Sequence, residues 1–195
     1  MWIIAGPNGA GKSSFAGDFL SGLGYRNLKK LNADERTVEL RRKFPAALQD
    51  DLNLKAAIEI DKEVEDCIRY RVSFVVETVL SSPKYRDDVL VAKENGFKFG
   101  LIYISLYPPE ISPQRVSERV AMGGHNVKAE KAIERYHRSH KQLSWFAPQA
   151  DALMAFDNSL KYSPVLLASR ISNEPLQYHA RGVNPAVEGA LALLS

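Results

Sequence analysis

The sequence predicts an α/β fold of three layers, in which helices cover both faces of a central, mainly parallel sheet of about five strands. Two observations lead to this prediction. Short runs of apolar and β-branched residues alternate along the chain with longer segments of helical periodicity. The first run, residues 2–5, opens directly into a glycine-rich loop that precedes a helix expected over residues 13–20. Strand, loop and helix follow in the order of a parallel βαβ unit.

The glycine-rich loop reads Gly-Pro-Asn-Gly-Ala-Gly-Lys-Ser at positions 6–13 and matches the spacing G-x-x-x-x-G-K-S. In this motif, backbone N–H groups and the start of the following helix face a phosphate. Lys12 is expected between the β- and γ-phosphates, and the Ser13 hydroxyl on Mg²⁺. A glycine-rich turn without a ligand is the structural alternative. The expected nucleotide-binding residues are Gly6, Pro7, Asn8, Gly9, Ala10, Gly11, Lys12, Ser13 and Ser14.

Length and composition favour one globular domain over residues 1–195. Apolar residues make up 45% of the chain and charged residues 25%, and the net charge of +3 is too small to indicate a nucleic-acid partner by itself. The single cysteine, Cys67, excludes an internal disulfide framework. The sequence shows no membrane-spanning stretch and no basic leader before the first strand, so we expect a cytoplasmic protein.

A second short strand is expected at residues 28–32, and Asp34 follows its end. Because ligands bind beyond the carboxyl ends of parallel strands, this carboxylate would face the phosphates. Transfer of a phosphoryl group to a hydroxyl requires a base, so Asp34 is the candidate catalytic base. It could also cap a helix that begins at Glu35.

Residues 48–71 predict a long helix with one apolar face. Its other face is acidic and is expected to be solvated, although it could also meet a basic partner. The acidic residues are Glu59, Asp61, Glu63, Glu65 and Asp66.

A third strand at residues 73–78 ends in Glu77 and Thr78. A carboxylate at this place suits Mg²⁺, bound through water, or the hydroxyl groups of a substrate. Ser82 and Pro83 predict the start of a helix that ends near residue 95. The apolar run at 99–106 predicts a central strand. No Asp follows it to help hold Mg²⁺, which counts against a motor or transporter ATPase and favours a small-molecule kinase.

Arginines are concentrated on two predicted helices between residues 108 and 147. Arg115 and Arg119 lie one helical turn apart, and Arg135 and Arg138 share a face of the second helix. The two helices could form a lid that brings guanidinium groups onto the transferring phosphoryl group. The arginines could also be ordinary surface residues.

Three histidines lie between residues 120 and 140. His125, in the turn Gly-Gly-His that joins the two helices, could contact phosphate or sugar. His137 and His140 are expected at the surface. A fifth strand at 152–156 precedes Asn158, which we expect near the adenine ring, and a hairpin is expected over 165–171 and 176–179.

These motifs together resemble the zeta toxin family of P-loop kinases, in particular small single-domain members described as predicted ATPases. The resemblance covers the chain from residue 1 to about 159. It is carried by the phosphate loop, by Asn32-Ala33-Asp34, by Glu77-Thr78, by Arg119-Val120 with Gly123-Gly124-His125-Asn126-Val127, by residues 133–139, and by Asp157-Asn158-Ser159.

The resemblance implies a P-loop kinase-like fold with a helical lid and a C-terminal hairpin. It also implies ATP and Mg²⁺ as cofactors, and transfer of the γ-phosphoryl group to a hydroxyl of a nucleotide sugar, UDP-N-acetylglucosamine in the studied branch. A protein antitoxin is the implied partner.

Carried over by position, the resemblance implies Asp34 as the base, Arg119 as a phosphate clamp, and Glu77 with Thr78 as acceptor ligands. The Glu-Thr pair is one residue tighter than the Glu-Gly-Thr of the studied toxins. His125 stands near the place of the second family arginine, and Arg135 is the nearest alternative.

Two other functions fit parts of the same pattern. A kinase acting on nucleic-acid ends would want a basic, aromatic-lined groove, which the acidic helix does not offer. An ATP-binding switch or interaction module would need the phosphate loop but has no use for a base beside the γ-phosphate. Asp34 therefore separates the switch from the kinase.

Overall fold

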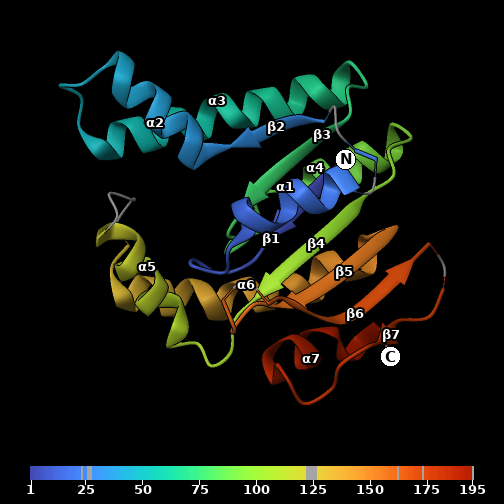
Figure 1. Cartoon of the computed structure of the whole chain (residues 1–195). Helices are drawn as coiled ribbons and strands as arrows, with labels where there is room; N and C mark the ends of the chain where they lie inside the picture. Colours follow the sequence, from blue (N-terminus) through green and yellow to red (C-terminus); the bar gives the residue numbers. More distant parts are fainter. Residues whose placement is uncertain (23, 26–27, 122–126, 162, 173, 195) are drawn as a thin grey trace.

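The computed structural model describes residues 1–22, 24–25, 28–121, 127–161, 163–172 and 174–194, with the backbone alone at 15–18. Within these residues, strands and helices alternate as predicted, and the strands form one sheet (Figure 1). The strands are β1 (Trp2–Ala5), β2 (Lys29–Asn32), β3 (Phe74–Thr78), β4 (Gly100–Ser105), β5 (Ala152–Asp157), β6 (Val165–Ile171) and β7 (Gln177–Tyr178).

The sheet has the order β2-β3-β1-β4-β5-β6-β7. The strands β2, β3, β1, β4 and β5 pair in parallel, and β6 and β7 extend the sheet as an antiparallel hairpin. The mainly parallel sheet and the C-terminal hairpin are confirmed. Because β1 lies between β3 and β4, the chain winds outward in both directions from β1, and such a switch point is where ligands bind in open parallel sheets.

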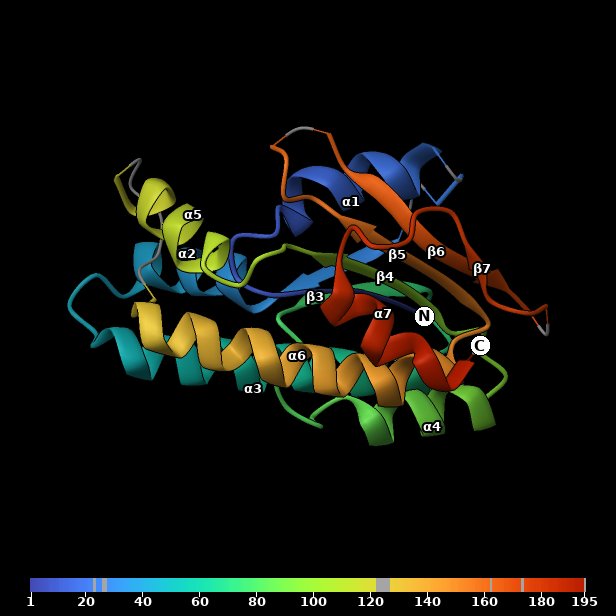
Figure 2. The same cartoon turned by 90° about the horizontal axis from the view of Figure 1, so that it is seen from below.

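Helices cover both faces of the sheet (Figure 2). The face that carries α1 contains Trp2 and Ile4, and the opposite face, which packs on α3, α4, α6 and α7, contains Ile3 and Ala5. Both faces of the central strands are therefore buried, which explains their near-continuous apolar sequences. The helices are α1 (Lys12–Gly22), α2 (Ala33–Lys43), α3 (Gln49–Arg69), α4 (Arg86–Glu94), α5 (Ile111–Ala121), α6 (Ala129–Gln149) and α7 (Pro185–Leu191).

The helices α2 and α3 form a hairpin at the β2 edge of the sheet, and ion pairs hold it together (Figure 1). The guanidinium group of Arg36 on α2 lies 2.9 Å from Glu59 and 2.6 Å from Glu63 on α3, and Lys29 on β2 lies 2.7 Å from Glu63. The prediction of a solvated acidic face is therefore wrong at these two glutamates. These glutamates join α3 to α2 and to β2.

Two helices begin at other residues than predicted. Helix α2 begins at Ala33, and the side chain of Asn32 caps it by accepting hydrogen bonds from the N–H groups of Asp34 (2.9 Å) and Glu35 (3.3 Å). Asp34 is therefore not the cap, and its carboxylate remains available. Helix α4 begins at Arg86, not Pro83, because residues 83–86 form a turn closed by a 2.9 Å backbone hydrogen bond.

His140 is buried, contrary to the prediction of a surface residue. Its Nδ1 lies 2.8 Å from the carbonyl of Tyr136, which can only accept, so Nδ1 carries the proton. Its Nε2 lies 2.9 Å from the Ser105 hydroxyl and accepts its proton in the neutral ring. His140 lies one turn after Tyr136 on the buried face of α6, a place that its polarity concealed in the sequence. Burial lowers the pKa of His140 to about 4.

We expect His140 to make stability depend on pH. The unfolded chain binds the histidine proton with a pKa near 6.5 and the native state with one of about 4. Acidification between these values protonates the unfolded chain first, so stability falls as pH falls. At pH 5 this difference amounts to roughly 2 kcal/mol. Urea unfolding at pH 7.5 and pH 5 should show a smaller loss for His140→Gln than for the natural protein.

The exposed neighbour His137 supplies the matched control. His137→Gln should retain the loss of stability that the natural protein shows on acidification. Equal losses in the natural protein and in His140→Gln would contradict a neutral, buried His140.

Candidate functional site

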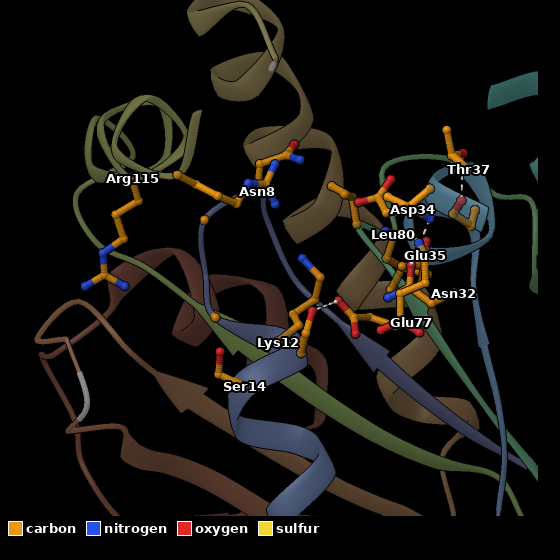
Figure 3. Close-up of a pocket in the computed structure, with 18 of the residues that line it drawn as sticks. Asn8, Lys12, Ser14, Asn32, Asp34, Glu35, Thr37, Glu77, Leu80 and Arg115 are labelled. Carbon is orange, nitrogen blue, oxygen red and sulfur yellow. Dashed lines mark hydrogen bonds between the residues drawn. The ribbon is translucent and has the colours of Figure 1, made fainter. Parts of the chain in front are cut away.

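A cavity of about 1010 Å³ opens where the carboxyl ends of the parallel strands meet. Its wall is built from the phosphate loop, α2, the end of β3, α5 and the segment after β5 (Figure 3). The volume lies at the upper end of the usual range of roughly 300–1,000 Å³ for ligand pockets. The predicted site residues on its wall are Asn8, Gly9, Gly11, Lys12, Ser13, Ser14, Asp34, Glu77, Thr78, Arg119 and Asn158.

The shape of the phosphate loop depends on two glycines. Gly6 has φ +142°, and a Cβ there would lie 1.9 Å from the carbonyl oxygen of Ile104 on β4. Gly11 has φ +82°, and a Cβ there would lie 2.7 Å from the Asn158 side chain. Both positions have a backbone conformation that favours glycine. A side chain at Gly6 would clash with backbone, and one at Gly11 would displace the Asn158 side chain. The loop is therefore pressed against β4 and the segment after β5.

The ammonium group of Lys12 binds to the backbone of the phosphate loop. Its Nζ donates hydrogen bonds to the carbonyls of Gly6 (2.9 Å) and Pro7 (3.0 Å). Burial lowers the pKa of Lys12, and the nearby carboxylates of Glu77 and Asp34 act in the opposite direction. The charged groups that sequence spacing suggested for the site are thus within electrostatic reach of this lysine.

Ser13 and Glu77 form a hydroxyl–carboxylate pair beside Lys12. The Ser13 hydroxyl donates to Glu77 Oε1 at 2.7 Å (Figure 3). The pairing of β1 with β3, in which Ile4 lies opposite Glu77, fixes this contact. Such oxygen ligands suit Mg²⁺, which usually keeps several waters and substrate phosphates around it. No group of three or more acidic, histidine or cysteine side chains among the described residues could hold a metal ion alone.

The carboxylate of Asp34 lines the cavity from the first turn of α2. It is exposed, and within the described residues its side chain makes no hydrogen bond or ion pair. Asn32 caps the helix, so Asp34 has no structural task at this end of α2. Thr78 lines the cavity too; its hydroxyl accepts a 3.1 Å hydrogen bond from the N–H of Leu80, which leaves its own proton for a ligand.

Two buried amide oxygens lie beside the phosphate loop. The Nδ2 of Asn158 donates to the carbonyl of Ala10 at 2.9 Å, which ties the segment after β5 to the loop. The Oδ1 atoms of Asn158 and Asn8 are buried and have no hydrogen-bond partner within the described part of the chain. Buried acceptors of this kind favour a ligand that supplies N–H or O–H donors.

The segment from residue 1 to residue 160 matches the protein-family model described as Zeta toxin. This chain belongs to the zeta toxin family. An uncharacterized protein of Haemophilus influenzae is 28% identical to it over 146 residues, which cover 70% of this chain and 96% of that protein. The resemblance to the zeta toxin family that the motifs indicated is confirmed.

Solved structures of other proteins have a fold similar to that of this chain. The complex AvrRxo1-ORF1:-ORF2 with ATP contains a chain with a TM-score of 0.72 and 19% identity, and the match covers 91% of this chain. This chain spans only 60% of that one. A structure from the PezAT chromosomal toxin-antitoxin system of Streptococcus pneumoniae has a TM-score of 0.59 and 15% identity, with 85% of this chain and 70% of that chain covered.

Not every residue predicted to clamp phosphate in this zeta toxin family chain lines the cavity. Arg119 lines it from α5, whereas no described residue of α6 does, so Arg135 lies outside its wall. Helix α6 runs along a face of the sheet (Figure 2), whereas the residues that line the cavity lie at the strand ends and on α2, α3 and α5. Arg138 pairs with Glu134 at 3.1 Å on the surface of α6. His125 lies outside the described residues.

The part of the cavity wall that α2 and α3 build was not predicted from the sequence. It is lined by Thr37, Val38, Arg41, Gln49 and Asn53. No motif marks these residues, because they come together only when the α2–α3 hairpin folds. A contact between the phosphate loop and α5 was not predicted either; there the Ser112 hydroxyl donates to the carbonyl of Asn8 at 2.7 Å.

In the described part of the chain, no helix is long and apolar enough to cross a membrane.

We expect Gly11→Ala to weaken nucleotide binding. The alanine would adopt an unfavourable positive φ and would also crowd Asn158 beside the loop. Gly96→Ala is the matched control, because Gly96 has nearly the same φ of +84° and open space around it. Each change should cost about 1–2 kcal/mol of stability through the backbone. Isothermal titration with ATP should show weaker binding for Gly11→Ala alone; equal affinities would contradict a role for this close contact.

Proposed function

We propose that this protein is an ATP-dependent kinase of the zeta toxin type, which transfers the γ-phosphoryl group of ATP to a hydroxyl of a nucleotide sugar such as UDP-N-acetylglucosamine. The observation that supports this most is the Asp34 carboxylate, which makes no hydrogen bond or ion pair among the described residues and lines the same cavity as Lys12. A protein that only binds ATP has no need of such a base. The cavity volume leaves room for two substrates.

In this mechanism, the N–H groups of the phosphate loop and Lys12 hold the phosphates of ATP. The Ser13–Glu77 pair would hold Mg²⁺, which when bound neutralises phosphate charge. Thr78 holds the acceptor hydroxyl near Asp34, and Asp34 accepts its proton. A bond forms between the acceptor oxygen and the γ-phosphorus, the bond from that phosphorus to the β–γ bridging oxygen breaks, and ADP leaves. Arg119 stabilises the charge of the transferring group.

A similar solved structure supports a proposal about the partner. That structure comes from a toxin-antitoxin system, and we propose a protein antitoxin for this protein as well. Expression of the chain alone in a bacterial host should then slow growth, and expression of Asp34→Asn should not. Equal growth of the two strains, at equal protein levels, would argue against toxicity.

We expect Asp34→Asn to abolish most phosphoryl transfer and to leave ATP binding intact. Loss of a general base typically costs about 10²–10⁴-fold in rate. The measurement is mass spectrometry of UDP-N-acetylglucosamine after incubation with protein, ATP and Mg²⁺. The natural protein should yield a product heavier by one phosphoryl group. A metabolite extract in place of the nucleotide sugar extends the same assay to other acceptors.

Glu35→Gln is the matched control for this substitution. Glu35 is the next residue of α2, is exposed and lines the same cavity, so the change removes the same charge. It should retain transfer. Loss of activity in Glu35→Gln, with activity retained in Asp34→Asn, would show that Asp34 is not the base.

We expect Glu77→Gln to raise the Mg²⁺ concentration needed for half-maximal activity. The amide keeps the hydrogen bond from Ser13 but loses the charge that attracts the cation. Titration of the transfer rate with Mg²⁺ at saturating ATP measures this. An unchanged Mg²⁺ requirement with a raised KM for the acceptor would instead place Glu77 at the acceptor.

A further inference from the structure

Beyond Asp34, the cavity continues to a second wall that the transfer chemistry does not use. We call it the distal wall; it is formed by residues of α2 and of the first turns of α3, the hairpin at the β2 edge of the sheet (Figure 1). These residues are Thr37, Val38, Arg41, Gln49 and Asn53. Because Asp34 lies on α2 near the start of the same helix, a ligand with its hydroxyl at Asp34 has room to extend toward them.

A chain of hydrogen bonds fixes the orientation of both amide side chains on the distal wall. Arg41 Nη2 donates to Gln49 Oε1 at 2.8 Å, and Gln49 Nε2 donates to Asn53 Oδ1 at 2.9 Å. A guanidinium group can only donate, so Gln49 must present its oxygen to Arg41 and its NH₂ group to Asn53. Asn53 is left with its NH₂ group free. This series of hydrogen bonds therefore ends in the two N–H donors of Asn53.

The guanidinium group of Arg41 also donates to the protein backbone. In addition to Gln49, it donates to the carbonyls of Pro45 (3.2 Å) and Ala47 (2.6 Å). These three hydrogen bonds go to neutral oxygens and leave two of the five N–H groups of the guanidinium unused. The distal wall thus favours a group that supplies hydrogen-bond acceptors. Val38, 53% exposed, adds an apolar surface beside them.

Contacts within the protein hold the distal wall in place. Arg36 on α2 pairs with Glu59 and Glu63 on α3, and the turn between the helices is closed by the contacts of Arg41. Leu40, Leu52 and Ala56 pack together between the two helices. Side chains that are fixed in advance bind with a smaller loss of conformational entropy.

We propose that the distal wall is a recognition subsite for the acceptor, and that it takes a group with carbonyl-type hydrogen-bond acceptors at the end remote from the reacting hydroxyl. This inference rests on the proposed function, since it assumes an acceptor bound at Asp34. Asn53 is the specificity-determining residue, because its NH₂ group is the donor that the hydrogen-bond chain leaves over. The heterocycle of a pyrimidine nucleotide has the required chemistry.

The test is Asn53→Asp, which is nearly isosteric. The new carboxylate still accepts the hydrogen bond from Gln49, so the hairpin keeps its contacts, but it presents acceptors to the ligand in place of donors. The matched control is Lys62→Gln, which changes the net charge by the same amount at an exposed position of α3 outside the cavity wall. Steady-state rates are measured with UDP-N-acetylglucosamine and with N-acetylglucosamine 1-phosphate, which lacks the carbonyl-bearing ring.

We expect Asn53→Asp to raise the KM for UDP-N-acetylglucosamine about tenfold or more, since carbonyl groups lose their donor and meet a negative charge. Its kcat, its KM for ATP and its KM for N-acetylglucosamine 1-phosphate should match those of Lys62→Gln. If the natural protein phosphorylates UDP-N-acetylglucosamine and Asn53→Asp has the same KM as the control, the subsite is overturned and the proposed function stands. If the natural protein phosphorylates neither probe, the proposed acceptor fails, and the subsite with it.

Discussion

The buried ammonium group of Lys12 is the constraint on which the site depends. A buried cation is costly unless hydrogen bonds and opposite charges surround it. Its hydrogen bonds go to the carbonyls of Gly6 and Pro7, which lie directly after β1. Its counter-charges come from Glu77 at the end of β3 and Asp34 after β2. The parallel order β2-β3-β1 is what delivers all of these groups to one edge of the sheet.

This arrangement explains why the functional carboxylates differ in their surroundings. Glu77 accepts a hydrogen bond from Ser13 at 2.7 Å and is fixed by the register of β3 against β1. Asp34 lies one strand farther from Lys12, on a helix whose cap is supplied by Asn32. One carboxylate is therefore held beside the phosphate loop, and the other is exposed in the cavity. Their positions in the strand order suit the two different roles that we propose for them, at Mg²⁺ and at the acceptor.

The parts of the site that sequence could predict are those that short-range spacing encodes. The phosphate loop, Asp34 after β2 and Glu77 at the end of β3 each follow a recognisable strand. The distal wall could not be predicted, because Arg41 and Asn53 meet only through the α2–α3 hairpin. Arg135 was predicted in the lid from its helix face, but helical periodicity does not say which edge of a sheet that face meets. His140 was predicted at the surface because it is polar, but a polar residue can satisfy its hydrogen bonds inside a core.

The proposed mechanism also requires that water be kept from competing with the acceptor. A rigid swing of α5 is opposed by three contacts: Ser112 with the phosphate loop, Arg115 Nη2 with the carbonyl of Ser159 at 2.7 Å, and Glu118 with Lys161. These contacts hold the helix from which Arg119 lines the cavity. Under the proposed function, discrimination against water then falls to the acceptor side, where contacts remote from the reacting hydroxyl would position it against Asp34. The distal wall is the part of the cavity that we propose for such contacts.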